Sequence, residues 1–143
     1  MQRIERIVHV DRPLTRVWEY LSDFTSTNDW DPGTVRTERR SGDGGLGTVY
    51  HNVSKFLGRE TEVIYTVIDI EPHHLLRLRG ENKSLTATDT LTFEGDETAT
   101  TVTYVAEFEF RKVAKLVDPL MTFPLKKLGD DAAKEMQKSL EAL

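Results

Sequence analysis

Apolar and polar residues alternate along much of this chain, which is the pattern of strands with one buried and one exposed face. The alternation is clearest in TATTVTYVAEFEF, where Val102, Tyr104 and Ala106 share one parity and threonines and glutamates fill the other. Residues 2–10 alternate in the same way. Between residues 33 and 111 similar short segments are separated by turn signals such as Glu71-Pro72, so the pattern predicts about seven antiparallel strands in all.

Helical spacing is found on either side of this strand-rich region. Leu14, Val17, Trp18 and Leu21 predict a short amphipathic helix over 13–22, and a second helical turn is predicted to close at Trp30. At the other end of the chain, apolar residues recur at intervals of three and four from Leu125 onward. This spacing predicts a long amphipathic helix. The residues that show it are Leu128, Ala132, Met136, Leu140 and Leu143.

The order of these elements predicts an α+β fold: a curved antiparallel sheet around a long C-terminal helix, with two short helices after the first strand. The helix is the element that can cover the apolar face of such a sheet. When a sheet curls around a helix, the space between them can hold a cavity instead of a solid core.

Length and composition restrict the function. The 143 residues suffice for one domain, which we place at 1–143, and 38% hydrophobic and 30% charged residues are typical of a globular domain. A net charge of −5 gives no general attraction to phosphate, so we expect no nucleic-acid partner. No apolar run approaches the roughly 20 residues of a membrane span, so we expect no stable membrane insertion and a cytoplasmic location.

Several short motifs together resemble a known family. They are Val10-Asp11-Arg12-Pro13, Val17-Trp18, Leu21-Ser22-Asp23, Trp30-Asp31-Pro32, Gly47-Thr48 and Val67 with Glu71-Pro72, followed by the terminal amphipathic helix. Across essentially the whole chain the sequence resembles the START-like or Bet v1-like helix-grip superfamily, in its bacterial polyketide cyclase/dehydratase and lipid-transport (SRPBCC) branch. The resemblance implies the helix-grip fold. It does not select a chemistry, because members include ligand carriers and aromatic cyclases.

No cofactor or metal is expected. GDGGLG at 42–47 matches a dinucleotide fingerprint, but a strand follows it where the fingerprint needs a helix. The chain has no cysteine, and His73-His74 lacks the helical spacing of a zinc motif.

The orientation of residues 49–54 decides which polar side chains reach a cavity. If Val49 and Val53 face inward, His51 is a buried base. If an aromatic after Gly-Thr faces inward, as the resemblance implies, Tyr50 and Asn52 face the cavity instead, and we favour this second orientation.

Asp89 is the carboxylate with the most unusual position. It shares a parity with Leu85, Ala87, Leu91 and Phe93, and if that parity faces inward, Asp89 lies among apolar side chains. Such burial raises the pKa of a carboxyl and suits either an acid–base group or a handle for a ligand hydroxyl. A register bulge, or pairing with an arginine, is the structural alternative.

The remaining candidates are aromatic and aliphatic residues that could line a pocket or fill a core. Trp30 is either a residue of the cavity mouth or a hydrophobic plug. The full set of candidate wall residues is Trp30, Tyr65, Leu76, Leu78, Tyr104, Phe108, Leu120, Met121, Phe123 and Met136.

Three functions follow. The first is binding of a small hydrophobic or amphipathic molecule, such as a lipid, a polyketide-like aromatic or an isoprenoid, in a cavity between the sheet and the C-terminal helix. Residues 22–32 and 113–125 would then act as the lid. The second is a cofactor-free cyclase or dehydratase in which Asp89 or His51 moves protons. The third is a protein-interaction domain with a filled core.

Overall fold

The computed structural model describes residues 1–56, 58–111 and 114–143, and describes no side chains at Phe56 or across 114–124. Seven strands, three helices and one 3₁₀ turn are present in these ranges. In chain order they are β1 (Gln2–Val10), α1 (Leu14–Leu21), η1 (Phe24–Ser26), α2 (Thr27–Trp30), β2 (Thr34–Ser41), β3 (Val49–Phe56), β4 (Arg59–Glu71), β5 (Leu75–Glu81), β6 (Leu85–Gly95), β7 (Thr100–Phe110) and α3 (Ala114–Glu141).

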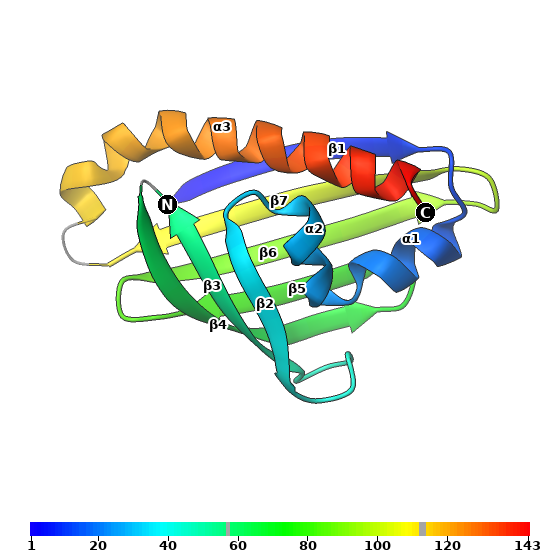
Figure 1. Cartoon of the computed structure of the whole chain (residues 1–143), viewed down its shortest axis with the longest axis horizontal. Coiled ribbons are helices and arrows are strands. Elements are labelled where there is room, and N and C mark those ends of the chain that lie inside the picture. Colours follow the sequence, from blue (N-terminus) through cyan, green and yellow to red (C-terminus); the bar gives the residue numbers. More distant parts are fainter. Residues whose placement is uncertain (57, 112–113) are drawn as a thin grey trace.

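The strands form one sheet in the order β1-β7-β6-β5-β4-β3-β2, and every neighbouring pair is antiparallel. The N-terminal strand therefore joins the last strand, while the others pair in sequence as hairpins. Strands β2 to β4 cross the direction of β6 and β7, so the sheet is strongly curved (Figure 1). The predicted fold class, the two short helices after the first strand and the long C-terminal helix are all confirmed.

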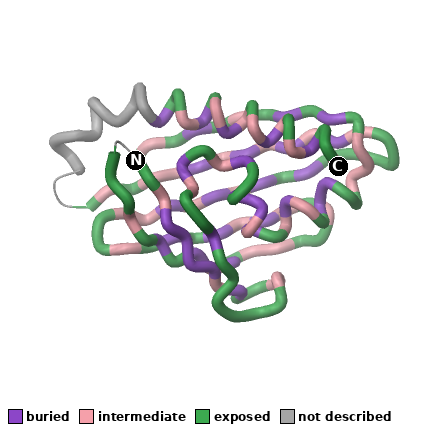
Figure 2. Tube along the Cα trace, viewed as in Figure 1, coloured by how far each residue is buried: buried purple, intermediate pink, exposed green. Residues whose placement is uncertain are grey.

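Helix α3 lies along β1 on the concave side of the sheet and also contacts β7 and α2 (Figure 1). Its buried side chains follow the predicted stripe, since Ala132, Met136 and Leu140 are all at most 3% exposed. Buried residues alternate with more exposed ones along the strands of the sheet (Figure 2). The core is therefore the space between α3 and the concave face of the sheet.

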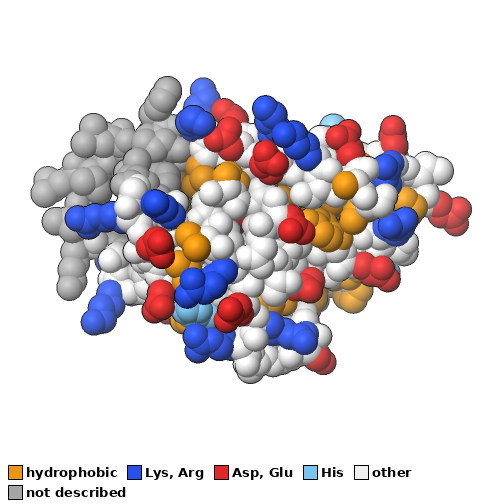
Figure 3. Space-filling view, in the orientation of Figure 1, with side chains coloured by type: hydrophobic (Ala, Val, Ile, Leu, Met, Phe, Trp, Pro, Cys, Tyr) orange, Lys and Arg blue, Asp and Glu red, His pale blue; other side chains and the backbone are white. Residues whose placement is uncertain are grey.

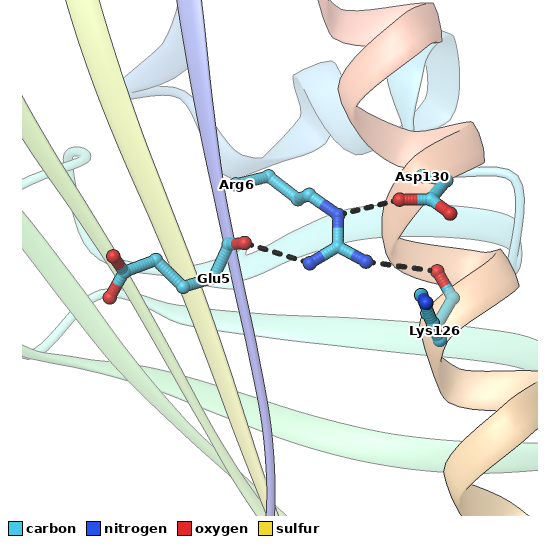
Figure 4. Close-up of polar contacts among 4 residues, drawn as sticks. All are labelled: Glu5, Arg6, Lys126 and Asp130. Atoms are coloured by element: carbon cyan, nitrogen blue, oxygen red, sulfur yellow. Dashed lines mark hydrogen bonds and ion pairs between the residues drawn. The ribbon is translucent and has the colours of Figure 1, made fainter.

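One arginine ties α3 to the edge strand of the sheet. From β1, Arg6 donates through Nε to Oδ1 of Asp130 at 2.8 Å and through Nη2 to the carbonyl of Lys126 at 3.1 Å (Figure 4). Its third nitrogen donates to the carbonyl of Glu5 at 2.8 Å. The planar guanidinium thus bridges two turns of the helix and the strand with fixed geometry.

The short helices close the far end of the core. Trp18 on α1 is 8% exposed, and its ring lies 5.0 Å from that of Phe93 on β6 in an edge-to-face arrangement. Phe24 in η1 lies 4.9 Å from the ring of Tyr65 on β4. This end of the molecule is filled by aromatic side chains.

On the outside, acidic and basic side chains are interspersed over the face seen in Figure 3, without a large patch of one sign. Among the described residues, no helix has the length and apolar character needed to cross a membrane.

Candidate functional site

A cavity of about 100 Å³ lies between the sheet and α3. It exists because small residues face each other across this part of the core. Ala87 on β6 and Ala106 on β7 are diagonal neighbours, since Ala87 pairs with Phe108 and Ala106 with Asp89, and Gly129 and Ala132 form the facing surface of α3. Larger side chains at these positions would fill the space, as they do further along the same strands at Leu91 and Val102.

The walls of the cavity are mainly apolar. The apolar side chains from the sheet are Ile4, Val63, Leu85, Ala87, Ala106, Phe108 and Phe110, and those from α3 are Leu125, Leu128 and Ala132. Asp31, Tyr65, Asp89 and Tyr104 lie close enough to affect one another's pKa and form the polar end. Ser54 and Thr61, a cross-strand pair next to Lys55, are further polar residues of the lining. Exposed Lys55 also lines the cavity, which therefore reaches the surface beside β3. An apolar pocket with a few convergent polar groups is the usual form of a small-molecule site.

Asp89 and Tyr104 form the centre of the polar end. Asp89 is 5% exposed on β6, and the Tyr104 hydroxyl on β7 donates to its Oδ2 at 3.4 Å. Burial, and to a lesser extent the negative charge of Asp31, raises the pKa of Asp89 from 3.8 to about 7. Near neutral pH the Asp89 carboxyl therefore exists in both protonation states, which is the property required of an acid–base group.

Asp31 enters the cavity from the turn after α2. Its Oδ1 accepts from the backbone N–H of Gly33 and its Oδ2 from the Thr34 hydroxyl, both at 3.0 Å. This is an Asx-type turn, which fixes the carboxylate in place. Desolvation nevertheless raises the pKa of Asp31, and the two hydrogen bonds oppose that rise only in part.

Tyr65 crosses the floor of the cavity because its neighbour has no side chain. Tyr65 pairs with Gly80 across β4 and β5, and Gly80 pairs in turn with Ala87. A Cβ at position 80 would lie 2.6 Å from the Tyr65 ring, so glycine is needed there for the ring to lie flat over β5. Burial, followed by the charges of Asp89 and Asp31, raises the pKa of both Tyr65 and Tyr104 well above the ordinary value, so both hydroxyls stay protonated donors.

Four of the residues proposed from sequence line this cavity: Tyr65, Asp89, Tyr104 and Phe108. Asp89 points inward, and none of the ion pairs among the described residues involves it, so the alternative of pairing with an arginine does not hold. Trp30 lies directly behind this group, with its ring 5.4 Å from that of Tyr104, and is 1% exposed. Its Nε1 donates to the Ser26 hydroxyl at 3.1 Å, so Trp30 matches the predicted plug and is not at the mouth.

The other candidates fall outside the lining. Leu76, Leu78, Tyr50 and Met136 are at most 1% exposed and belong to the solid core. The side chains of Leu120, Met121 and Phe123, and most of the expected lid at 113–125, lie outside the described residues.

Asn52 faces inward together with Tyr50, as the favoured orientation of this strand predicts, but it is held in a polar network. Its Nδ2 donates to Thr37 Oγ1 at 2.9 Å, and its Oδ1 accepts from Ser54 Oγ at 2.5 Å. The hydroxyls of Thr27 and Thr37 continue the network at 2.7 Å. These contacts connect α2, β2 and β3 and leave Asn52 away from the cavity.

His51 lies on the opposite face of the sheet. It pairs with Ile64, which is 41% exposed on the convex side, and its Nε2 lies 3.4 Å from the carboxylate of exposed Glu62. His51 is therefore not placed to move protons in the cavity. The valines that share its parity are on this outer face, which is why the alternative orientation is incorrect.

Asp31 is the site residue that the sequence did not single out. Its signal was present in the Trp-Asp-Pro-Gly turn, where an aspartate two residues before a glycine indicates an Asx turn. Only the fold shows that this turn lies beside β6. The glycines of GDGGLG connect β2 to β3, with positive φ at Gly42, Gly44 and Gly47, and no group of three or more metal-ligating side chains occurs in the described part of the chain.

Solved structures with this fold include aromatase/cyclases and proteins named only by superfamily or as conserved proteins. The chain is 16% identical to the Zhui aromatase/cyclase from a Streptomyces species, with 99% of this chain and 92% of that one covered and a TM-score of 0.77. It is 14% identical to a START superfamily protein from Mycobacterium smegmatis, with 99% of each chain covered and a TM-score of 0.80. A conserved protein from Geobacillus kaustophilus is 20% identical over 98% and 95% of the two chains, with a TM-score of 0.74.

At these identities the likeness shows the fold alone, and no curated protein sequence matches the chain. The sequence itself matches the family described as polyketide cyclase / dehydrase and lipid transport over residues 1–143. With its helix-grip fold and its cavity under α3, the chain belongs to the polyketide cyclase/dehydrase and lipid transport family.

Proposed function

We propose that this protein binds a small hydrophobic or amphipathic molecule in the cavity between α3 and the sheet. The observation that carries the proposal is the arrangement of the lining, with mainly apolar walls and a group of four polar side chains around Asp89, while Ser54, Lys55 and Thr61 add polar groups elsewhere in the lining. Burial of apolar ligand surface would supply affinity, and the polar end would fix orientation. The family to which the chain belongs contains proteins of this kind.

The size of the cavity limits what it can hold. Its volume of about 100 Å³ is below the roughly 300–1,000 Å³ of pockets that enclose drug-sized ligands. We therefore propose a ligand with a short chain or one ring inside the cavity, or a larger molecule that inserts only one end. A third function, an interaction domain with a filled core, is disfavoured because small residues hold this space open.

Native mass spectrometry of the purified protein, followed by denaturing extraction, tests the binding proposal. We expect a bound small molecule, or uptake of added hexanol, in the unmodified protein. Ala106→Leu would fill the cavity and abolish binding, whereas the same change at exposed Ala142 is expected to leave it intact. Equal ligand occupancy in the two variants, with both folded by circular dichroism, would contradict the proposal.

Acid–base catalysis of cyclisation or dehydration is the second candidate, and the geometry at Asp89 favours it. In its carboxylate form Asp89 can accept an α-proton from a ketone and become the neutral acid, while the Tyr104 hydroxyl, released from its hydrogen bond to Asp89, donates to the developing enolate oxygen. Exchange of the α-protons of cyclohexanone, which is slow in buffer, with deuterated water, followed by NMR, would detect this step. We expect exchange above the buffer rate and a loss of about 100-fold or more in Asp89→Asn. Exchange at the buffer rate would exclude this candidate and leave the binding proposal in place.

A further inference from the structure

The polarity of the cavity changes in order along β6 and β7. The register pairs Asp89 with Ala106, Ala87 with Phe108 and Leu85 with Phe110. Moving outward along the strands, the lining thus passes from a carboxylate to small apolar residues and then to large ones. Beyond Asp89 the strands continue into solid core at Leu91 and Phe93, so the polar end is the closed inner end.

The cavity carries acidic groups without a matching cation. Asp31 and Asp89 both line it, and neither forms an ion pair with any described lysine, arginine or histidine. Asp89 is at the inner end, and Asp31, which is partly exposed, lies near enough to raise the pKa of Asp89. Lys55 is the basic residue among the described lining residues; it is exposed, and its backbone N–H donates to the carbonyl of Gly33 beside Asp31. Burial of a carboxylate without a cation is costly, so this arrangement is unusual for a purely structural core.

Asp89 also has unused capacity to accept hydrogen bonds. A carboxylate offers about four acceptor sites. Within the described part of the chain, Asp89 receives one hydrogen bond, the 3.4 Å contact from Tyr104 to Oδ2, although the residue is 95% buried. Asp89 is also one of the residues that line the cavity. A ligand group that donates hydrogen bonds and carries positive charge would fill the free acceptor sites of Asp89 and also balance its negative charge.

We propose that the ligand is a primary amine with a short apolar tail, which enters with its ammonium group first and places it between Asp89, Asp31 and the Tyr104 hydroxyl. Its tail lies along Ala87, Phe108 and Phe110. This inference rests on the proposed binding function and names the class of ligand. A fatty acid is disfavoured in either orientation. If its carboxylate enters first, it meets the acidic groups of Asp31 and Asp89. If its tail enters first, those two groups are desolvated against hydrocarbon.

Binding of an ammonium group is linked to the protonation of Asp89. The titratable groups that face Asp89 are Asp31 from the turn after α2, Tyr65 from β4 and Tyr104 from β7, with Lys55 at the outer end of the cavity. The residue beside Asp89 on β5 is Leu78, and the lining residues of α3 carry no titratable group. Below pH 7 a bound ammonium must displace the proton that Asp89 holds, so amine affinity is expected to rise from pH 5 to pH 8 and then level off.

Calorimetric titration of the full chain with hexylamine, hexanol and sodium hexanoate separates these possibilities, since the three probes share one tail. At pH 8 we expect hexylamine to bind at least 10-fold more tightly than hexanol, and hexanoate to bind most weakly. At pH 5 the preference for the amine should shrink. Asp89→Asn should weaken hexylamine binding at least 10-fold, remove its pH dependence and change hexanol binding less than 3-fold.

Two outcomes overturn the inference, and they differ in whether the proposed binding function is still supported. If hexanol binds and Ala106→Leu abolishes that binding, but hexylamine has no advantage at pH 8, the amine preference is wrong and the binding function is supported. If none of the probes binds at either pH, the proposed function falls together with the inference. Should Asp89→Asn fail to fold, the pH series on the unmodified protein gives the same decision.

Discussion

Gly80 and Tyr65 are direct partners across β4 and β5, and the Tyr65 ring occupies the space where a side chain at position 80 would stand. A Cβ there would lie 2.6 Å from Cε1 of the ring and 2.7 Å from a methyl group of Val63. This pairing explains why glycine, which weakens strands elsewhere, is present in the middle of a buried sheet. It also fixes the tyrosine that forms one wall of the cavity.

Gly80→Ala is therefore expected to displace Tyr65 and reduce the free energy of unfolding by about 1–3 kcal/mol. Urea unfolding followed by tyrosine and tryptophan fluorescence measures the change. Gly45→Ala is the matched control, because a Cβ at Gly45 meets only the flexible side chain of Asp43, at 3.2 Å. The control should change stability by less than about 0.5 kcal/mol. Equal effects of the two substitutions would show that the Tyr65 contact does not constrain position 80.

Asp89 is expected to make stability fall as pH rises. Its folded pKa of about 7 lies above the ordinary value of 3.8, so between these values the folded state holds a proton that the unfolded state has lost. Stability from this group is complete below about pH 4, declines up to about pH 7 and is then constant, with a total change of up to about 4 kcal/mol. In Asp89→Asn this decline should become much smaller, with the remainder coming from Asp31, whose pKa is also raised by burial, and above pH 7 the variant should be more stable than the unmodified protein.

Urea unfolding at a series of pH values from 4 to 8 tests the Asp89 prediction. Asp11→Asn makes the same change at an exposed position and should preserve the decline. A parallel decline in Asp89→Asn would mean that another group causes it. Asp31 would then be the next residue to substitute, because burial raises its pKa as well.

At Gly129, α3 packs directly against β1 without room for a side chain. A Cβ at this position would overlap the Cγ2 methyl of Ile4 and approach the Arg6 guanidinium carbon to 3.3 Å. Alanine normally favours a helix over glycine by up to about 1 kcal/mol, but here we expect Gly129→Ala to destabilise the protein by about 1–3 kcal/mol. The steric cause is tested by a double-mutant cycle with Ile4→Ala, which removes the methyl group. The two changes should be non-additive by at least about 0.5 kcal/mol, and strict additivity would rule out this contact as the cause.

The sequence was sufficient to predict which face of a strand is buried wherever the apolar residues of that strand share one parity. In β7, Val102, Tyr104 and Ala106 point inward as their pattern predicts. In β4 both parities are apolar, and the exposed ones, Ile64 and Ile68, are 41% and 40% accessible. Hydrophobicity alone could not orient that strand. Its orientation follows from the pairing with Gly80, which depends on a partner strand that local patterns do not specify.

The residues of the site were harder to predict from the sequence than the fold. Asp89 was identified because one charged residue interrupted an apolar parity. Asp31 was not, because its place in the cavity comes from the approach of the turn after α2 to β6, which are distant in the chain. The cavity itself results from small residues on three elements facing one another, and nothing local distinguishes such alanines and glycines from those in a filled core.

Substitution of Asn52 tests whether this residue has a structural role or a ligand-binding role. Asn52→Ala removes a donor to Thr37 and an acceptor for Ser54 in a buried network, and we expect a loss of about 1–3 kcal/mol in the free energy of unfolding. Lys134→Ala on the exposed side of α3 should change it by less than about 0.5 kcal/mol. Since Asn52 lies outside the cavity lining, folded Asn52→Ala should bind hexanol as the unmodified protein does, as measured by calorimetry well below its unfolding temperature. If hexanol affinity falls while stability is retained, Asn52 reaches the ligand after all, and the sequence-based assignment of a binding role is correct.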